Sequence, residues 1–136
     1  MVPDSVSAPI PDSATAARTL WVLYAPFALA KFRPLLLTCN LKGHALESLQ
    51  ALVGGYIEKV TVKVPSTGVE LDFWVNENGL DYGFPEPRPV DTHRGFVQHL
   101  YGPVVVAAFD EEGGTIGVAP DFSGARELAD LLNAGT

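Results

Sequence analysis

Alternation of hydrophobic and polar residues is clearest in the middle of the chain. In residues 56–64 (YIEKVTVKV) the valines alternate with polar side chains, and residues 69–75 (VELDFWV) repeat this period of two. That period is typical of strands with one buried face. The intervening Pro65-Ser66-Thr67-Gly68 has the composition of a turn. The pattern therefore predicts a β-hairpin.

The turn also predicts the register of this hairpin. If Val64 pairs with Val69, the next pairs are Val62–Leu71, Val60–Phe73, Glu58–Val75 and Tyr56–Glu77. Side chains two residues apart share a face of a strand. The alternation then predicts inward positions for Val69, Leu71, Phe73 and Val75, and outward positions for Glu70, Asp72 and Trp74.

Other apolar runs predict further strands. Residues 21–24 form a first strand that ends before Pro26, and residues 34–39 (PLLLTC) form a short buried one. Residues 104–109 (VVVAAF) are apolar on both faces, which predicts a central strand. The acidic segment 110–114 (DEEGG) predicts a tight turn that leads into residues 115–119.

Helical spacing appears in three places. Leu46, Leu49 and Val53 lie on one stripe, and Gly54-Gly55 follow as a helix end. Residues 92–100 predict a short helix that buries Phe96, Val97 and Leu100. A last helix begins near Ser123 and buries Leu128, Leu131 and Leu132.

These elements predict an α+β fold, in which an antiparallel or mixed sheet with a central hairpin is covered by two or three helices. The length of 136 residues and the 47% hydrophobic content fit one domain with a full core. We expect a single domain over residues 19–136. Residues 1–18 are dominated by Pro, Ser, Ala and Asp, so we expect a flexible N-terminal tail there.

Charge and cysteine content exclude several classes of function. The net charge is −7: residues 1–68 carry four acids and six bases, and residues 69–136 carry twelve acids and three bases. Such a surface repels phosphate, which argues against direct binding of nucleic acid. The apolar run at residues 20–30 is shorter than the roughly twenty residues that span a bilayer, so no membrane association is expected. A single cysteine, Cys39, excludes an internal disulfide, and with no export signal before it the sequence favours the cytoplasm.

The strongest candidate for a ligand-binding site is one end of the predicted hairpin. The register places an inward carboxylate, Glu58, on the same side as Val60 and Val62, where it needs a partner. Desolvation there would suit a general acid or base, but acceptance of backbone N–H bonds at the sheet margin is the alternative. The residues that gather at this end are Gly54, Gly55, Tyr56, Glu58, Asn76 and Glu77.

Other chemical motifs are weaker. On a helix His93 and His99 would point about 120° apart, so a metal site of Asp91, His93 and His99 is not favoured; His44 is expected at the surface. The glycine-rich run 113–117 (GGTIG) follows three acids and lacks the lysine of a phosphate-binding loop. No nucleophile elbow is present, and Cys39 is expected to be a buried thiol. The sequence therefore predicts no metal, no cofactor and no catalytic set.

Three sequence blocks point to a family. Residues 49–58 (LQALVGGYIE), 75–80 (VNENGL) and 102–113 (GPVVVAAFDEEG) together resemble a family of small proteins of unknown function found in phages, plasmids and bacterial chromosomes. Such proteins often carry an Asn-Arg-x-Ala-Thr segment between the last two blocks. Here residues 86–92 (EPRPVDT) keep only the Arg and the Thr. The resemblance implies a setting in mobile elements, and it includes the six residues of the hairpin end.

Three functional hypotheses follow. The first is a non-catalytic accessory protein of phage or plasmid type, which binds a protein partner or a second copy of itself. The second is a small-molecule binder, for a nucleotide-like signal, at Tyr56, Glu58 and Asn76. The third is a hydrolase with Glu58 or Glu77 as general base; the sequence leaves enzymatic activity open and favours a non-catalytic role.

Overall fold

The computed structural model describes residues 18–39, 46–64, 67–79, 83–84 and 86–134. The predicted N-terminal tail and His44 lie outside the described residues, as does the side chain of Cys39. The strands are β2 (Arg18–Ala25), β3 (Arg33–Cys39), β4 (Ile57–Lys63), β5 (Glu70–Asn76), β6 (Arg88–Asp91), β7 (Val97–Leu100), β8 (Val104–Phe109) and β9 (Thr115–Ile116). The helices are α1 (Leu46–Val53) and α2 (Phe122–Ala134), so the α+β class is confirmed.

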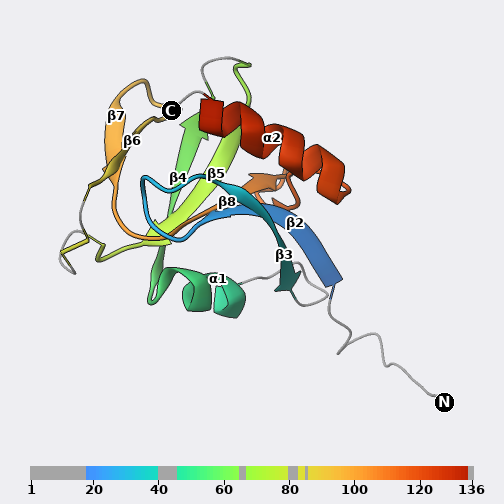
Figure 1. Ribbon diagram of the computed structural model, residues 1–136, viewed down its shortest axis with the longest axis horizontal. Helices are drawn as coiled ribbons and strands as arrows, with labels where there is room; N and C mark the ends of the chain where they lie inside the picture. The colour runs from blue at the N-terminus through green and yellow to red at the C-terminus, as the bar shows by residue number, and fades with distance from the viewer. Residues whose placement is uncertain (1–17, 40–45, 65–66, 80–82, 85, 135–136) are drawn as a thin grey trace.

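The main sheet is antiparallel and has the strand order β3-β2-β8-β5-β4, with β9 paired to β8 beside this path (Figure 1). The apolar strand β8 lies in the middle, where it pairs with β2 through Leu23–Val106 and with β5 through Phe73–Val106. Its four residues 104–107 are buried. The prediction of a central strand from its apolar run is confirmed.

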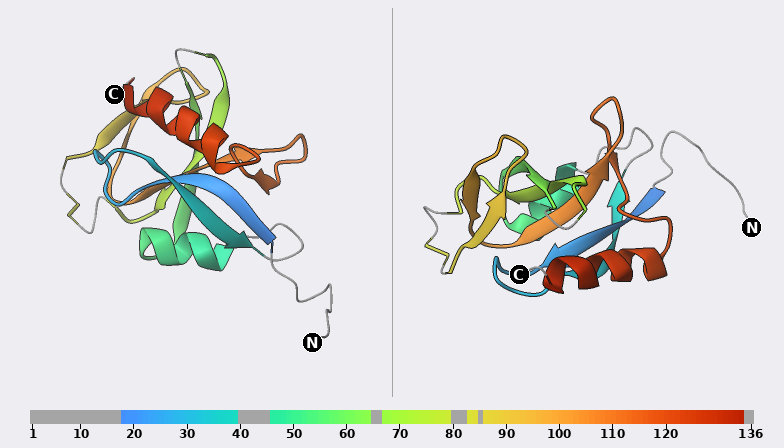
Figure 2. Two further views of the ribbon diagram at one scale, coloured as in Figure 1. Left: turned by 45° about the vertical axis from the view of Figure 1, so that its right-hand side comes forward. Right: turned by 90° about the horizontal axis from the view of Figure 1, so that it is seen from above.

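The sheet is buried on both faces. Helix α2 covers one face and α1 the other (Figures 1 and 2). Residues of alternating parity along β8 enter separate cores, so that Val104 and Val106 pack on the α2 side, while Val105 and Ala107 pack on the α1 side. Double coverage explains why β8 is apolar at every position. It also corrects one expectation: Asp72, predicted to face outward, is 2% exposed because its face of the sheet is the α1 core face.

The β4–β5 hairpin has the predicted register. Val62 pairs with Leu71, Val60 with Phe73, and Glu58 with Val75. At the turn, Val64 N donates to Val69 O over 2.8 Å. Val69 itself is 51% exposed, so its predicted inward position is wrong: it precedes β5 and extends past the covered part of the sheet.

The predicted helix over residues 92–100 is wrong. The segment forms the turn after β6 and then β7, and β6 and β7 pair antiparallel from Arg88–Leu100 to Asp91–Val97. Gly95 in the turn has a φ of +86°, a conformation that glycine adopts without strain and that a helix does not allow. Leu100 is buried as expected, but Phe96 and Val97 are 53% and 54% exposed.

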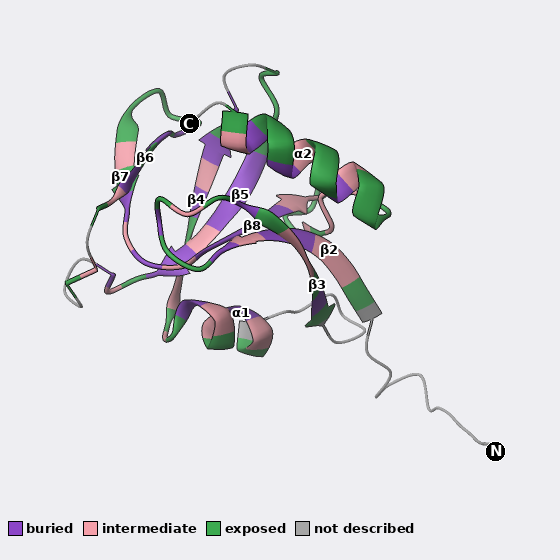
Figure 3. Cartoon of the chain, in the orientation of Figure 1, coloured by how far each residue is buried: buried purple, intermediate pink, exposed green. Residues whose placement is uncertain are grey.

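Helix α2 begins after Asp121, whose carboxylate accepts a hydrogen bond from Gly124 N over 2.8 Å, as an N-cap does. Small residues, Ala125 and Ala129, pack with Leu132 against the sheet. Leu131, predicted to be buried, is 37% exposed. Figure 3 shows exposed residues along the outer side of this helix. Leu128 and Leu132 pack on the core as predicted, together with Ala125 and Ala129.

Candidate functional site

The structure brings the six predicted site residues together at one corner of the hairpin. Gly54 ends α1 with a φ of +82°, and its amide donates to Gln50 O over 2.9 Å. The chain then turns into β4, where Tyr56 O accepts a hydrogen bond from Glu77 N over 2.9 Å. This bond is the predicted Tyr56–Glu77 pairing.

Asn76 acts as a clamp in this corner. Its side chain is 3% exposed; Nδ2 donates to Val53 O over 3.1 Å, and Oδ1 accepts from Asn78 N over 2.8 Å. The first bond satisfies a carbonyl at the end of α1, which has no partner within the helix. Asn76 thus joins α1 to β5, and its polar atoms serve the fold.

The inward position of Glu58 is wrong. Glu58 lies on the α2 side of the sheet, as Val60 does, yet it is exposed. Helix α2 packs mainly on β2 and β3, and among the described residues the Glu58 side chain stays exposed at the start of β4. Tyr56, at 69% exposure, and Glu77 are exposed as well, which makes the corner an open surface.

The residues of the alternative sites lie apart from this corner. His93 is exposed, and its amide donates to Thr61 O over 3.0 Å; His99 is exposed on β7 opposite Pro89. Within the described part of the chain, no three side chains of His, Cys, Asp or Glu are placed to hold a metal ion.

Hydrogen bonds from Asp110 within the acidic turn 110–114 account for its conformation. Asp110 Oδ1 accepts hydrogen bonds from Glu112 N over 2.9 Å and from Gly114 N over 2.7 Å. Asp110 N also donates to Gly114 O over 2.9 Å. One carboxylate thus shapes the turn between β8 and β9, while Glu111 and Glu112 are exposed.

A polar cluster on the α1 face of the sheet was not predicted from the sequence. The buried carboxylate of Asp72 accepts a hydrogen bond from Thr61 Oγ1 over 2.9 Å and lies 3.9 Å from Lys59 Nζ. Lys59 Nζ is also 5.9 Å from the centre of the Trp74 ring. Among the described side chains, Trp74 Nε1 is buried without a hydrogen-bond partner. The cross-strand pairs Thr61–Asp72 and Lys59–Trp74 were visible in the predicted register, but Asp72 and Trp74 had been placed on a solvent face.

A second missed feature is the buried cation of Arg88. The residue is 3% exposed, and its guanidinium donates to the carbonyls of Ala28 and Ala30 and lies 4.4 Å from the centre of the Phe32 ring. Burial lowers the pKa of Arg88 from its ordinary value. The contacts join positions about sixty residues apart, for which the sequence pattern carries no signal.

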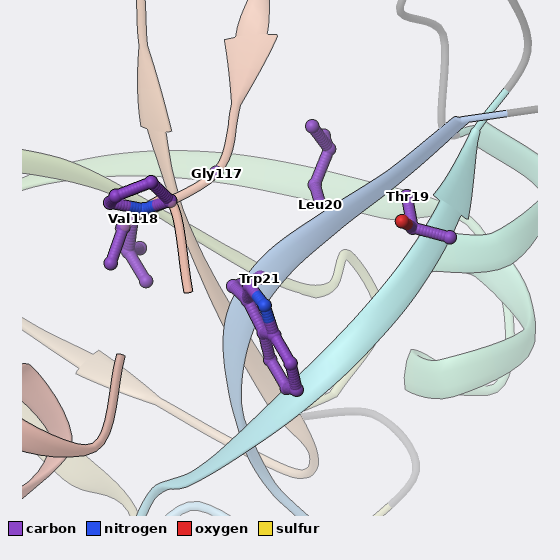
Figure 4. A pocket seen from close by; sticks show the side chains of 7 residues that line it. Thr19, Leu20, Trp21, Gly117 and Val118 are labelled. Carbon is purple, nitrogen blue, oxygen red and sulfur yellow. The ribbon is translucent and has the colours of Figure 1, made fainter. Parts of the chain in front are cut away.

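The described residues also form a groove between the start of β2 and the segment after β9 (Figure 4). Its volume is about 420 Å³, and it is open to solvent on one side. Two of its lining residues are joined by a hydrogen bond, in which Val118 N donates to Trp21 O over 2.8 Å. The lining residues are Thr19, Leu20, Trp21, Gly117, Val118, Ala119 and Pro120.

A comparison with protein families shows to which family the chain belongs. Residues 33–132 match the family described as Domain of unknown function (DUF3846). The chain belongs to this family. The DUF3846 match runs from the first residue of β3 to Leu132 in α2, and it contains the hairpin corner, Asp72 and Arg88. β2 and the loop after it precede the matched range.

No curated protein and no solved structure matches the chain. Within the described residues, no helix is long and apolar enough to cross a membrane.

Proposed function

We propose that this DUF3846 protein is a small, non-catalytic accessory protein that acts by binding another protein chain. The observation that carries the proposal is the use of its buried polar groups. Asp72, Asn76, Arg88 and Thr92 are the buried polar or charged residues among those described. Each of these four residues bonds to a neighbouring strand, loop or helix end, so none of the four is held ready for a substrate; Trp74 Nε1 is a buried donor without a partner among the described side chains.

Large apolar side chains, by contrast, are exposed in several places. They lie in loops, in strands and in α2. Clusters of exposed aromatic and aliphatic side chains are typical of protein-binding surfaces. The exposed residues are Phe27, Leu29, Leu36, Tyr56, Val69, Phe96, Val97, Ile116, Phe122 and Leu131.

The phage or plasmid setting in our proposal rests on the three sequence blocks between residues 49 and 113. Accessory proteins of mobile elements act on host or element-encoded proteins, and a cytoplasmic location is part of this proposal. The acidic surface of residues 69–136 favours a protein partner over nucleic acid.

A pull-down from lysate of the host cell, combined with size-exclusion chromatography of the pure protein, tests the proposal. We expect either a retained partner or an elution volume below that of the monomer. A matched bait in which Phe96 and Val97 are both replaced by Ser reports whether exposed apolar side chains carry the contact. A pure monomer that retains nothing from the lysate would contradict the proposal.

The second candidate function is binding of a small, nucleotide-like molecule at the hairpin corner. It is favoured by the exposed phenol of Tyr56 beside the exposed carboxylates of Glu58 and Glu77, on a backbone fixed by the Tyr56–Glu77 hydrogen bond. A metabolite extract should then raise the melting temperature, and Glu58→Gln should remove the rise. Glu70→Gln, on the exposed far end of the same hairpin, is the matched control. An unchanged melting temperature with every extract fraction would end this candidate.

A hydrolase is not favoured. Both candidate bases, Glu58 and Glu77, are exposed at the corner, whereas the described groove is lined by residues 19–21 and 117–120 and holds no carboxylate. A general base needs a substrate held within hydrogen-bond distance, and the open corner offers no such enclosure.

A further inference from the structure

Strand β3 forms one edge of the main sheet and β4 the other (Figures 1 and 2). An edge strand presents unpaired N–H and C=O groups, which proteins protect with charged side chains, proline, bulges or a covering element. In β3 the segment 34–38 (PLLLT) carries no charge, and Leu36 at its centre is 48% exposed. The middle of this edge is therefore apolar and open.

The backbone groups of Leu36 point away from the rest of the sheet. Its cross-strand partner Trp21 bonds on the opposite side of β2, where Trp21 O accepts from Val118 N over 2.8 Å. An added Cβ at Gly117 would lie 3.2 Å from both Trp21 N and Trp21 O, so both groups face that side. Neighbouring residues of a strand alternate in this direction, and antiparallel pairs alternate between bonded and non-bonded. The Trp21–Leu36 pair is therefore a non-bonded one, and Leu36 N and O are directed outward.

Side chains bond to outward backbone groups at both ends of β3, at residues an even number of positions from Leu36. Asn133 of α2 bonds to both groups of Phe32, over 2.7 Å to N and 3.0 Å to O. Ser48 of α1 donates from Oγ to Thr38 O over 2.7 Å. These bonds agree with the direction inferred for Leu36, and they close the edge on either side of it.

The groups that remain open are complementary to themselves. Because Pro34 has no N–H, the open groups among the described residues are Pro34 O, Leu36 N, Leu36 O and Thr38 N. If two copies of β3 run antiparallel with Leu36 opposite Leu36, each Leu36 N meets the Leu36 O of the other copy. Each Thr38 N then meets the Pro34 O of the other copy. The donor that Pro34 lacks falls opposite Thr38 O, which Ser48 already satisfies.

Other registers of the same pairing are less favourable. A shift that places Leu36 opposite Pro34 leaves Leu36 O without a donor, and an acceptor buried without its donor costs free energy. A shift the other way places Leu36 N against Thr38 O, which is already bonded to Ser48. An unrelated extended peptide has no cause to lack a donor opposite Thr38. The pattern of the edge therefore favours a second copy, in one register.

Apolar side chains lie beside the same edge. Leu36 shares a face of the sheet with its cross-strand partner Trp21, and Trp21 contacts Phe122 of α2 with ring centroids 5.6 Å apart. Phe122 is 49% exposed. A two-fold axis perpendicular to the sheet would bring the two Leu36 side chains together on this face. The exposed Arg33 would lie opposite Cys39 of the other copy, so the two Arg33 side chains do not meet.

We propose that two copies of this chain pair through their β3 edges, antiparallel and centred on Leu36, so that their main sheets become continuous. This inference rests on the proposed function and names its partner and surface. Both copies use the same surface, so the contact closes at a dimer. Backbone hydrogen bonds supply affinity when a strand is added to a sheet edge. The paired segment is short, which makes association weak and dependent on concentration.

Sedimentation velocity of the pure full chain over a range of concentrations is the first test. We expect a monomer that converts to a dimer as the concentration rises, with no larger species. Amide hydrogen exchange followed by NMR then locates the contact. Exchange at Leu36 N and Thr38 N should slow as the dimer forms, whereas Leu35 N, which faces β2, should be protected at every concentration.

A charge swap at residue 36 tests the two-fold register. Leu36→Glu and Leu36→Lys each place two like charges opposite one another, and each should raise the dissociation constant about tenfold or more. An equimolar mixture of the two variants should pair again, because the opposed charges are then of opposite sign. This rescue requires residue 36 of one copy to lie opposite residue 36 of the other.

Matched controls separate the edge from exposed apolar residues in general. Val97 is 54% exposed in β7, so Val97→Glu should leave the dimer unchanged. Leu36→Ala keeps the N–H and should weaken the dimer less than Leu36→Pro, which removes it. Far-UV circular dichroism and the melting temperature establish that each variant is folded, and the charge swap decides the matter if the proline variant does not fold.

Four results would overturn the inference: a wild type that stays monomeric at every concentration, growth beyond a dimer, a Leu36→Glu and Leu36→Lys mixture that fails to pair, or Leu36 and Thr38 amides whose exchange ignores concentration. Capture of a host protein by a monomeric wild type, lost on Leu36→Glu, would assign the edge to another chain and overturn the second copy. Capture that survives Leu36→Glu, with no self-association, would also overturn the inference, and in both cases the proposed function would stand.

Discussion

The side-chain amide of Asn133 pairs with the backbone of Phe32 through two hydrogen bonds, one accepted from N over 2.7 Å and one donated to O over 3.0 Å. The pair joins the last turn of α2 to the end of the β2–β3 loop, 101 positions away in the chain. It therefore closes the α2 side of the fold across almost the whole described length. Loss of the pair should loosen the helix and the loop together.

Asn133→Asp tests this closure. The substitution keeps an acceptor for Phe32 N but replaces the donor that faces Phe32 O with a second acceptor. A buried acceptor without its donor costs about 1–3 kcal/mol, so we expect the free energy of unfolding in urea to fall by about that amount. Asp130→Asn, on an exposed position of the same helix, is the control and should change it by less than about 0.5 kcal/mol. Equal stability of the two variants would show that the pair contributes nothing.

Arg88 should be more sensitive than any exposed cation. Arg88→Met leaves the carbonyls of Ala28 and Ala30 without their donor, and Arg88→Lys offers one compact ammonium in place of the planar fork. We expect a loss of about 2–4 kcal/mol for the methionine variant and a smaller loss for lysine. Arg94→Met, in the exposed β6–β7 turn, is the matched control. Chemical denaturation measures all three, and a neutral Arg88→Met would contradict the anchoring role.

The sequence predicted the hairpin well because the information there is local. The turn after Val64 sets the register, and each further pair follows from it. The helix predicted at residues 92–100 failed although a local signal existed. Gly95 marks the turn, where its amide donates to Thr92 O over 3.0 Å and Thr92 Oγ1 donates to Phe96 O over 2.9 Å. The helical spacing of three apolar residues was given more weight than the glycine.

The candidate site was predicted only in part. The convergence of Tyr56, Asn76 and Glu77 follows from the register, but alternation gives the face of a side chain and not the extent of the cover above that face. Glu58 is exposed because α2 packs over β2 and β3. In the same way, Asp72 is buried because α1 covers a second face. Both outcomes depend on helix placement, which a strand pattern does not contain.

The Thr61–Asp72 hydrogen bond should couple β4 to β5 energetically. Asp72 is 2% exposed, and its Oδ1 lies 2.9 Å from Thr61 Oγ1. A double-mutant cycle with Thr61→Val and Asp72→Ala measures the pair, because each change removes one partner of the hydrogen bond. We expect a coupling free energy of about 1 kcal/mol or more, because hydrogen bonds to charged groups exceed neutral ones. The cycle of Lys63→Met with Glu70→Gln, an exposed cross-strand pair of the same hairpin, should give about half of that or less. The same coupling in both cycles would contradict a special role for the buried carboxylate.

Replacing either of two glycines at the hairpin corner by alanine should destabilise the fold, for a different reason at each position. Gly54 has a φ of +82° and nothing within 4 Å of an added Cβ, so Gly54→Ala carries only backbone strain of about 1–2 kcal/mol. An added Cβ at Gly79 would lie 2.8 Å from the backbone oxygen of Tyr101 and 3.1 Å from its Cβ. The chain must shift to admit it, so Gly79→Ala should destabilise the fold more than Gly54→Ala does.

Replacement by asparagine separates backbone strain from crowding, since asparagine tolerates positive φ better than alanine. Gly54→Asn should be more stable than Gly54→Ala, whereas Gly79→Asn should be no more stable than Gly79→Ala. Thermal unfolding of the four variants checks the order, and a Gly54→Asn variant less stable than Gly54→Ala would show that crowding rather than strain governs the end of α1.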